Sequence, residues 1–189
     1  MKLTFAVVCL FTCSVCGFAQ APAAPTAPAQ AQAAPVKDPV ATSLRMLLSR
    51  SQNNTVGAIE AMPADKFNYK PTADQMTFGH LVAHIVGSNN FLCAKAASVD
   101  APKVEEVKET DSKDKLLAAT KTSYEFCSQA LSKMDDSHLS DSVELFGGKQ
   151  FPRAMAALGL ASGWADHYAA AAMYLRLNNI LPPSAQPKK

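Results

Sequence analysis

Apolar residues recur at every third or fourth position in four stretches of the 189-residue chain, a spacing typical of helices that bury one face. The pattern predicts helices over about 38–62, 77–97, 112–134 and 152–178. Asp38 is expected to cap the first helix, because Pro39 suits the first helical position. The buried stripe of that helix is expected to comprise Leu44, Leu47, Leu48, Ser51, Ala58, Ile59 and Met62. The predicted fold is all-α, a four-helix bundle with a long crossover connection.

The segments around the last three helices differ in character. Residues 98–110 are polar, acidic and rich in lysine, which predicts a solvated crossover between the second and third helices. Residues 142–146 suggest a short strand before the glycine pair at 147–148. The fourth helix carries small residues at helical spacing, which predicts close approach of a neighbouring helix along Ala154, Ala157, Ala161, Ala165, Ala169 and Ala172.

The beginning of the chain has the features of a targeting segment. Residues 1–19 combine Lys2, an apolar run and a small-residue exit, which predicts a signal peptide. A membrane anchor is the alternative, but the run is short and no stop-transfer charges follow it. Residues 20–37 are rich in Ala, Pro and Gln and predict a flexible linker, followed by a folded domain over 38–184 and a tail over 185–189. We therefore expect an exported protein, periplasmic or extracellular, with no integral membrane segment in the mature chain.

Charge and cysteine usage limit the function further. The 18 basic and 16 acidic residues leave no basic excess, so nucleic-acid binding is not expected. Of the five cysteines, only Cys93 and Cys127 lie outside the predicted signal peptide, and both fall on predicted inward faces. An even pair in an oxidising compartment is a disulfide candidate, and two unpaired core thiols are the alternative.

The four histidines are the candidate chemistry of the chain. His80 and His84 are four residues apart on the second helix and therefore share one face, a spacing that can offer two imidazoles to one metal ion. His167 on the fourth helix could complete a three-histidine site with an open position for water. Packed or surface histidines are the alternative interpretation of the same pattern. His138, beside two aspartates, is expected to be solvated.

Two segments together resemble the DinB/YfiT-like family of metal-dependent four-helix proteins, and in particular its secreted bacterial members. They are MPADKFNYKPTADQMTFGHLVAHIVGSNNFLC at 62–93 and HYAAAAMYLRLNNILPPS at 167–184. The resemblance covers the whole domain and implies an up-down-down-up bundle. It also implies a divalent metal held by one histidine of the second helix and an H-x-x-x-H pair of the fourth. His84 and His167 match two of these ligands, but Gly163 stands where the third is expected.

This departure leaves two interpretations of the metal site. In one, His80 supplies the third ligand, and the rearranged site binds Zn, Ni or Mn and activates water or a thiol. The resemblance then implies a metal-dependent hydrolase or thiol S-transferase. In the other, the site is degenerate and the protein binds a small molecule or a partner without catalysis. The sequence identifies neither a reaction nor a ligand, and the resemblance also allows a homodimer.

Overall fold

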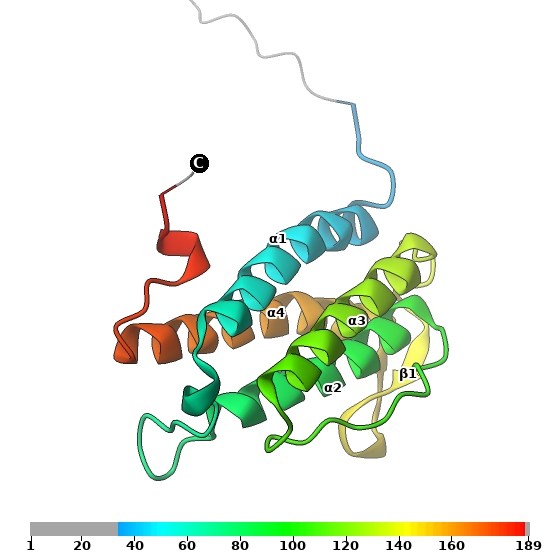
Figure 1. Ribbon diagram of the computed structural model, residues 1–189. Helices are drawn as coiled ribbons and strands as arrows, with labels where there is room; N and C mark the ends of the chain where they lie inside the picture. Colours follow the sequence, from blue (N-terminus) through cyan, green and yellow to red (C-terminus); the bar gives the residue numbers. More distant parts are fainter. Residues whose placement is uncertain (1–33, 188–189) are drawn as a thin grey trace, which may run out of the picture. The chain divides into compact units, whose positions relative to one another are not determined.

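The computed structural model describes residues 34–187, and the helical unit begins at Pro35 (Figure 1). The predicted signal peptide and most of the predicted linker lie outside the described residues. The long helices are α1 (Pro39–Ala61), α2 (Phe78–Ala97), α3 (Lys113–Ser132) and α4 (Arg153–Leu177). The short elements are the strands β1 (Ser142–Glu144) and β2 (Gln150–Pro152) and the 3-10 helices η1 (Ala64–Lys66), η2 (Phe146–Gly148) and η3 (Pro183–Ala185).

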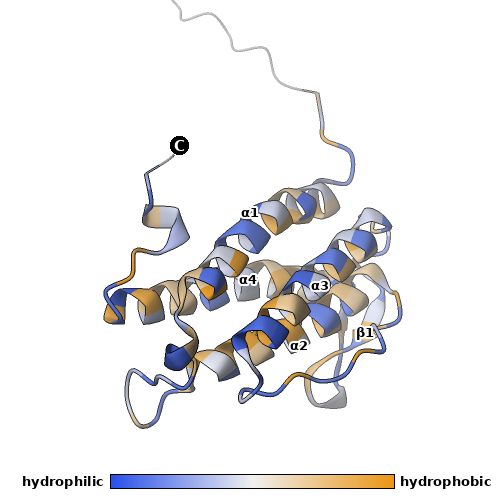
Figure 2. Ribbon diagram, viewed as in Figure 1, coloured by the Kyte–Doolittle hydropathy of each residue, from blue (hydrophilic) through white to orange (hydrophobic). Residues whose placement is uncertain are grey.

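The four long helices form the predicted bundle. Helix α2 packs against α3 and α4, and α1 packs against the same two helices, so α1 and α2 lie on one diagonal. Helices α1 and α4 run in one direction and α2 and α3 in the other, which makes the topology up-down-down-up (Figure 1). Helices α2 and α4 are the more hydrophobic pair (Figure 2). Within residues 34–187, no helix is both long and apolar enough to span a membrane.

The apolar core is divided into two clusters along the bundle. One contains Leu44, Leu92 and Trp164, and the other contains Ile59 and Phe78. Between the two clusters, every helix except α4 contributes buried polar side chains, namely Ser51, Thr55, Asn89, Thr120 and Ser123. A polar layer therefore crosses the middle of the bundle.

Asn89 is the centre of this polar layer. Its side-chain oxygen accepts a hydrogen bond from the indole nitrogen of Trp164 at 2.9 Å, and its amide donates to the Ser123 hydroxyl at 3.0 Å. One side chain thus joins α2, α3 and α4. Tyr124 links α3 to α1, because its hydroxyl donates to Thr55 at 3.1 Å. Burial raises the pKa of the Tyr124 hydroxyl, so it remains a donor.

Cys93 and Cys127 are at bonding distance between α2 and α3, as the sequence predicts. Their Cα atoms are 5.2 Å apart, within the range that disulfides require, and both side chains are fully buried. Asn89 lies one turn from Cys93 on α2, so the covalent link and the polar layer hold the same pair of helices.

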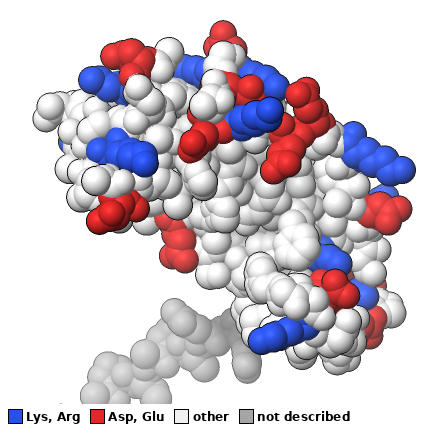
Figure 3. Space-filling view, turned by 90° about the horizontal axis from the view of Figure 1, so that it is seen from below, with Lys and Arg blue, Asp and Glu red and all other residues white. Residues whose placement is uncertain are grey.

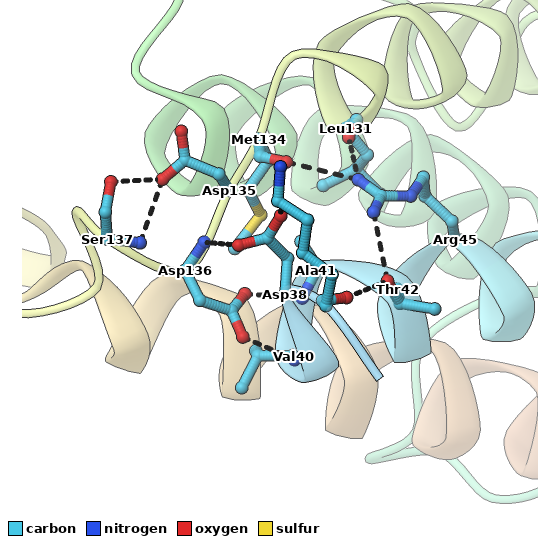
Figure 4. A network of polar contacts seen from close by, with 11 residues as sticks. Asp38, Val40, Ala41, Thr42, Arg45, Leu131, Met134, Asp135, Asp136 and Ser137 are labelled. Carbon is cyan, nitrogen blue, oxygen red and sulfur yellow. Dashed lines mark hydrogen bonds and ion pairs between the residues drawn. The ribbon is translucent and has the colours of Figure 1, made fainter. Parts of the chain in front are cut away.

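The start of α1 is capped by a residue from another part of the chain (Figure 4). Asp136 accepts hydrogen bonds from the backbone N–H groups of Val40 at 2.8 Å and Ala41 at 2.9 Å. Asp38 occupies the N-cap position, as expected, and its backbone carbonyl accepts from the Thr42 N–H at 2.8 Å, but its side chain makes no cap bond and its backbone is left-handed. Its carboxylate instead accepts from the Asp136 N–H at 3.2 Å.

Arg45 of α1 caps the carboxyl end of α3 at the same end of the bundle. Its guanidinium donates to the backbone carbonyls of Leu131 at 2.9 Å and Met134 at 3.1 Å, at the carboxyl end of α3 (Figure 4). Carbonyls at a helix end lack partners within the helix, and a cation there also opposes the helix dipole. Asp136, just after α3, therefore accepts from the free N–H groups of α1, and Arg45 of α1 donates to the free carbonyls of α3.

The other local predictions are confirmed in part. Strand β1 lies within the expected range but ends two residues early, and it pairs with β2, which the sequence did not predict. Leu47 was expected in the core but is 43% exposed. Ala165 and Ala169 are also exposed, because α4 packs mainly against α1 and α2.

Replacing Asp136 with Ala should lower the free energy of unfolding by about 1–2 kcal/mol, because two N–H groups of α1 lose their acceptor. Denaturant unfolding would measure the change. Asp135→Ala is the matched control, since Asp135 bonds only to Ser137 in its own loop. Equal losses in the two variants would contradict a capping role for Asp136.

The mature protein should contain no free thiol, and reduction should lower its stability by about 3–4 kcal/mol for a loop closed over a separation of 34 residues. A thiol assay and thermal melts with and without dithiothreitol would test this. The double variant Cys93→Ala/Cys127→Ala should melt at the same temperature in both buffers. Two reactive thiols in the oxidised, folded wild type would refute the bridge.

Candidate histidine site and adjoining groove

His84 of α2 and His167 of α4 are brought into contact. Their ring centroids are 4.9 Å apart and the ring planes are almost perpendicular, at 86°. The register of the two helices explains the meeting. His84 precedes Asn89 by five residues and His167 follows Trp164 by three, so the Trp164–Asn89 hydrogen bond holds both histidines at the level of the polar layer.

His167 lies over the position where the resemblance places a third ligand. A Cβ atom at Gly163 would be 3.5 Å from Cε1 of His167 and 4.0 Å from its Nδ1. That Nδ1 atom is buried and has no hydrogen-bond partner in the described chain. The pKa of His167 is lowered to about 4, mainly by burial and in smaller part by the charge of His84, while Asp166 opposes the shift. The ring is therefore neutral at physiological pH.

His80 belongs to a different arrangement at the start of α2. Its Nδ1 atom lies 2.9 Å from Oε2 of Glu109 on the crossover. Thr77 donates to the same carboxylate oxygen at 3.1 Å and, as the N-cap of α2, accepts from the His80 N–H at 2.9 Å. His80 thus fastens the crossover to the helix.

The donor set does not fit the metal centre that the resemblance implies. An open catalytic zinc site needs three protein ligands besides water. His84 and His167 offer two, Gly163 offers none, and Glu109 holds the third predicted ligand, His80. Among residues 34–187, no three His, Cys, Asp or Glu side chains are grouped so that they could hold a metal ion. The orphaned Nδ1 of His167 is the remaining feature that a metal would satisfy.

A groove of about 830 Å³ adjoins the histidines, between the outer face of α2 and residues 102–109 of the crossover. Its volume lies in the range of small-molecule sites. Both His80 and His84 line it, together with Gly87 and Asn90 on α2. The side-chain oxygen of Asn90 is buried without a hydrogen-bond partner.

The crossover wall of this groove is held in place by backbone contact as well as by His80. The chain passes so close to Gly79 that a Cβ atom there would collide with the carbonyl oxygen of Glu109. The Gly79 N–H donates to the Phe67 carbonyl at 2.7 Å, which fixes the helix start against the preceding loop. These contacts anchor the Glu109 end of the groove wall to the start of α2.

Sequence reasoning did not find Glu109 or Asn90. Glu109 is 29 residues from His80, and the acidic character of the crossover was the only hint of a partner there. Asn90 lies beside Asn89 in the sequence, and nothing in the helical periodicity distinguishes the core amide from the one that lines the groove.

Comparison with known proteins agrees with this architecture. The family model of the DinB superfamily matches residues 47–170, more than half of the chain. The crystal structure of a DinB-like protein from Bacillus subtilis is similar, with a TM-score of 0.61 and 20% sequence identity, and the match covers 77% of this chain and 99% of that one. No curated protein matches significantly. The bundle, its helix order and the matched segment lead to one conclusion: the chain belongs to the DinB superfamily.

Proposed function

We propose that this protein is an exported DinB-like bundle with an incomplete metal centre, which binds a small ligand instead of catalysing a metal-dependent reaction. The observation that carries the proposal is the donor set around His167. Gly163 supplies no ligand, and His80, the nearest candidate on α2, is hydrogen bonded to Glu109. Two imidazoles remain, those of His84 and His167, which would hold a divalent ion weakly.

The groove beside α2 is the proposed ligand site. It has the volume of a small-molecule site, mixed polar and apolar walls, and a fixed crossover. Asn90 supports this assignment, because its unpaired oxygen needs a donor that the described residues do not supply.

Export is supported by the sequence features of residues 1–19 and by the approach of Cys93 to Cys127. Disulfides persist in oxidising compartments and are rare in the cytosol. We therefore propose that the protein works in the periplasm or outside the cell.

A metal-dependent hydrolase or thiol S-transferase is the second candidate. The contact between His84 and His167 and the orphaned Nδ1 of His167 favour it. A bound divalent ion would activate water or a thiol as a Lewis acid. For this, His80 would have to leave Glu109 and join the other two histidines.

Titration with Zn, Ni and Mn distinguishes the two candidates. The mature protein, purified without tag or chelator, should bind metal substoichiometrically, whereas Gly163→His should gain about one ion per chain with roughly tenfold higher affinity or more. Calorimetry and elemental analysis would measure both. Gly163→Ala is the matched control, since it adds a side chain but no donor, and His84→Ala should remove the gain.

One result would overturn the proposed loss of the metal centre. If the wild-type protein holds nearly one ion per chain, and His80→Ala releases it, the histidines form the rearranged three-ligand site. The second candidate would then hold.

The metal-free protein should lose stability as the pH falls from 6.5 to about 4. The folded state keeps His167 neutral in this window, whereas the unfolded chain takes up the proton, so acid favours unfolding. Because the ring is partly exposed, solvent screening reduces this effect, and we expect the free energy of unfolding to fall by about 1–2 kcal/mol. Denaturant unfolding across this window should show a flatter profile for His167→Gln. His138→Gln is a surface control, which removes an exposed ring that contacts Asp141 in its own loop, and it should keep most of the wild-type slope. An unchanged slope in His167→Gln would contradict the assignment.

A further inference from the structure

We propose that the groove between α2 and the crossover binds a small organic cation with an apolar body, such as an alkylammonium ion. The inference rests on the proposed function, in that it takes this groove as the ligand site. It adds the chemical class of the ligand, which follows from the charges, the unpaired acceptor and the shape of the walls.

The charge of the groove is negative. Its crossover wall carries Glu105, Glu106 and Glu109 against one basic residue, Lys108. Glu105 is paired with Lys115, whose ammonium nitrogen lies 3.5 Å from its carboxylate. Lys108 also acts on a carboxylate outside the groove: its backbone N–H, and to a smaller extent its charge, lower the pKa of Asp111. On the face seen in Figure 3, acidic and basic side chains alternate around a broad uncharged area.

Glu106 is the carboxylate left without a partner. It makes no ion pair or hydrogen bond within residues 34–187, whereas Glu109 is engaged by Thr77 and His80. A bound ammonium group would pair with this carboxylate. An exposed ion pair alone stabilises little, so contact of the ligand with the apolar walls would supply the rest of the binding free energy.

Asn90 gives a second and independent reason for a donor-bearing ligand. Its side-chain oxygen is buried without a hydrogen-bond partner within the described residues, and the residue itself lines the groove. An ammonium group has N–H donors and no acceptor, so it can pair with a carboxylate and, when the Asn90 amide turns toward the groove, with this oxygen as well. An ionised carboxylate has no donor and could satisfy neither.

The rest of the lining favours an apolar body on that cation. Ala83, Val86 and Gly87 form the helix side, and Pro102, Val104 and Val107 form the crossover side. A Cβ atom at Gly87 would meet no heavy atom within 4 Å, so the missing side chain leaves open space in the groove. An alkyl or aryl chain can occupy that space.

The test compares three probes of similar size on the mature protein at low salt, namely hexylammonium, 1-heptanol and heptanoate. We expect hexylammonium to bind with a Kd on the order of 1 mM, as suits so small a ligand. Heptanoate should bind roughly tenfold more weakly or not at all, because the groove carries net negative charge. Calorimetry and amide chemical-shift changes would report binding.

Two variants locate the binding site. Gly87→Leu should fill the groove and abolish binding without loss of fold, because leucine is the better helix former, and Gly87→Ala is its matched control. Glu106→Gln should weaken hexylammonium binding roughly threefold or more and leave heptanol unchanged. Glu125→Gln, an exposed carboxylate of α3 outside the groove, should have no effect.

The outcomes separate this inference from the proposed function. Equal binding of all three probes, blocked by Gly87→Leu, would keep the groove as a ligand site and overturn the preference for a cation. Absence of hexylammonium binding at 20-fold the expected Kd (roughly 20 mM) would overturn the inference outright. Neither result bears on the metal centre, which the metal titration of Gly163→His tests separately.

Discussion

The need to satisfy the buried amide of Asn89 determines how the four helices fit together. A polar side chain in the middle of a helical core is tolerated only when its donors and acceptor are paired, and Asn89 pairs with Trp164 on one side and Ser123 on the other. Sliding α2 by one turn against either neighbour would break a bond and leave a buried group unsatisfied. Apolar packing alone permits several registers, because leucine and alanine fill space without direction. The Asn89 amide therefore selects one register of the helices.

The position of the candidate site follows from that register. His84 and His167 meet because the Trp164–Asn89 bond fixes α2 against α4 a few residues away. The contact between Cys93 and Cys127 holds α2 to α3 beyond the same layer, and Asp136 and Arg45 hold α1 to the end of α3. The groove lies outside this frame, on the exposed side of α2, where the crossover can form a wall without disturbing the core.

Periodic and local signals predicted much of this fold. The helix ranges, the bundle and the approach of Cys93 to Cys127 follow from spacing that any packed helix must obey. The cap at Asp136 and the contact between His80 and Glu109 do not follow, because they join residues that are distant in the sequence and depend on the final packing. Leu47 and Ala165 were assigned to buried faces because an apolar residue at the edge of a helical stripe looks the same in sequence whether or not a neighbour covers it. Helical spacing made His80, His84 and His167 candidate ligands, and the family resemblance singled out His84 and His167, but neither signal showed that His80 would be held by Glu109.

Gly163 bears on whether the metal centre around His84 and His167 is rearranged or incomplete. A glycine inside a helix weakens it by about 0.5–1 kcal/mol relative to alanine, so a packing benefit would be the usual reason to find one. Here a Cβ atom would make only ordinary contact with His167, at 3.5 Å, and the only other contact within 4 Å is the Nδ1 atom of the same ring. The position therefore gains no packing from being glycine. A centre rearranged around His80 would be expected to free that side chain from Glu109, but His80 is engaged there while the Nδ1 atom of His167 remains buried without a partner. The proposed loss of the metal centre therefore rests on three observations together, namely a glycine without a packing role, an engaged His80 and an unpaired His167 nitrogen.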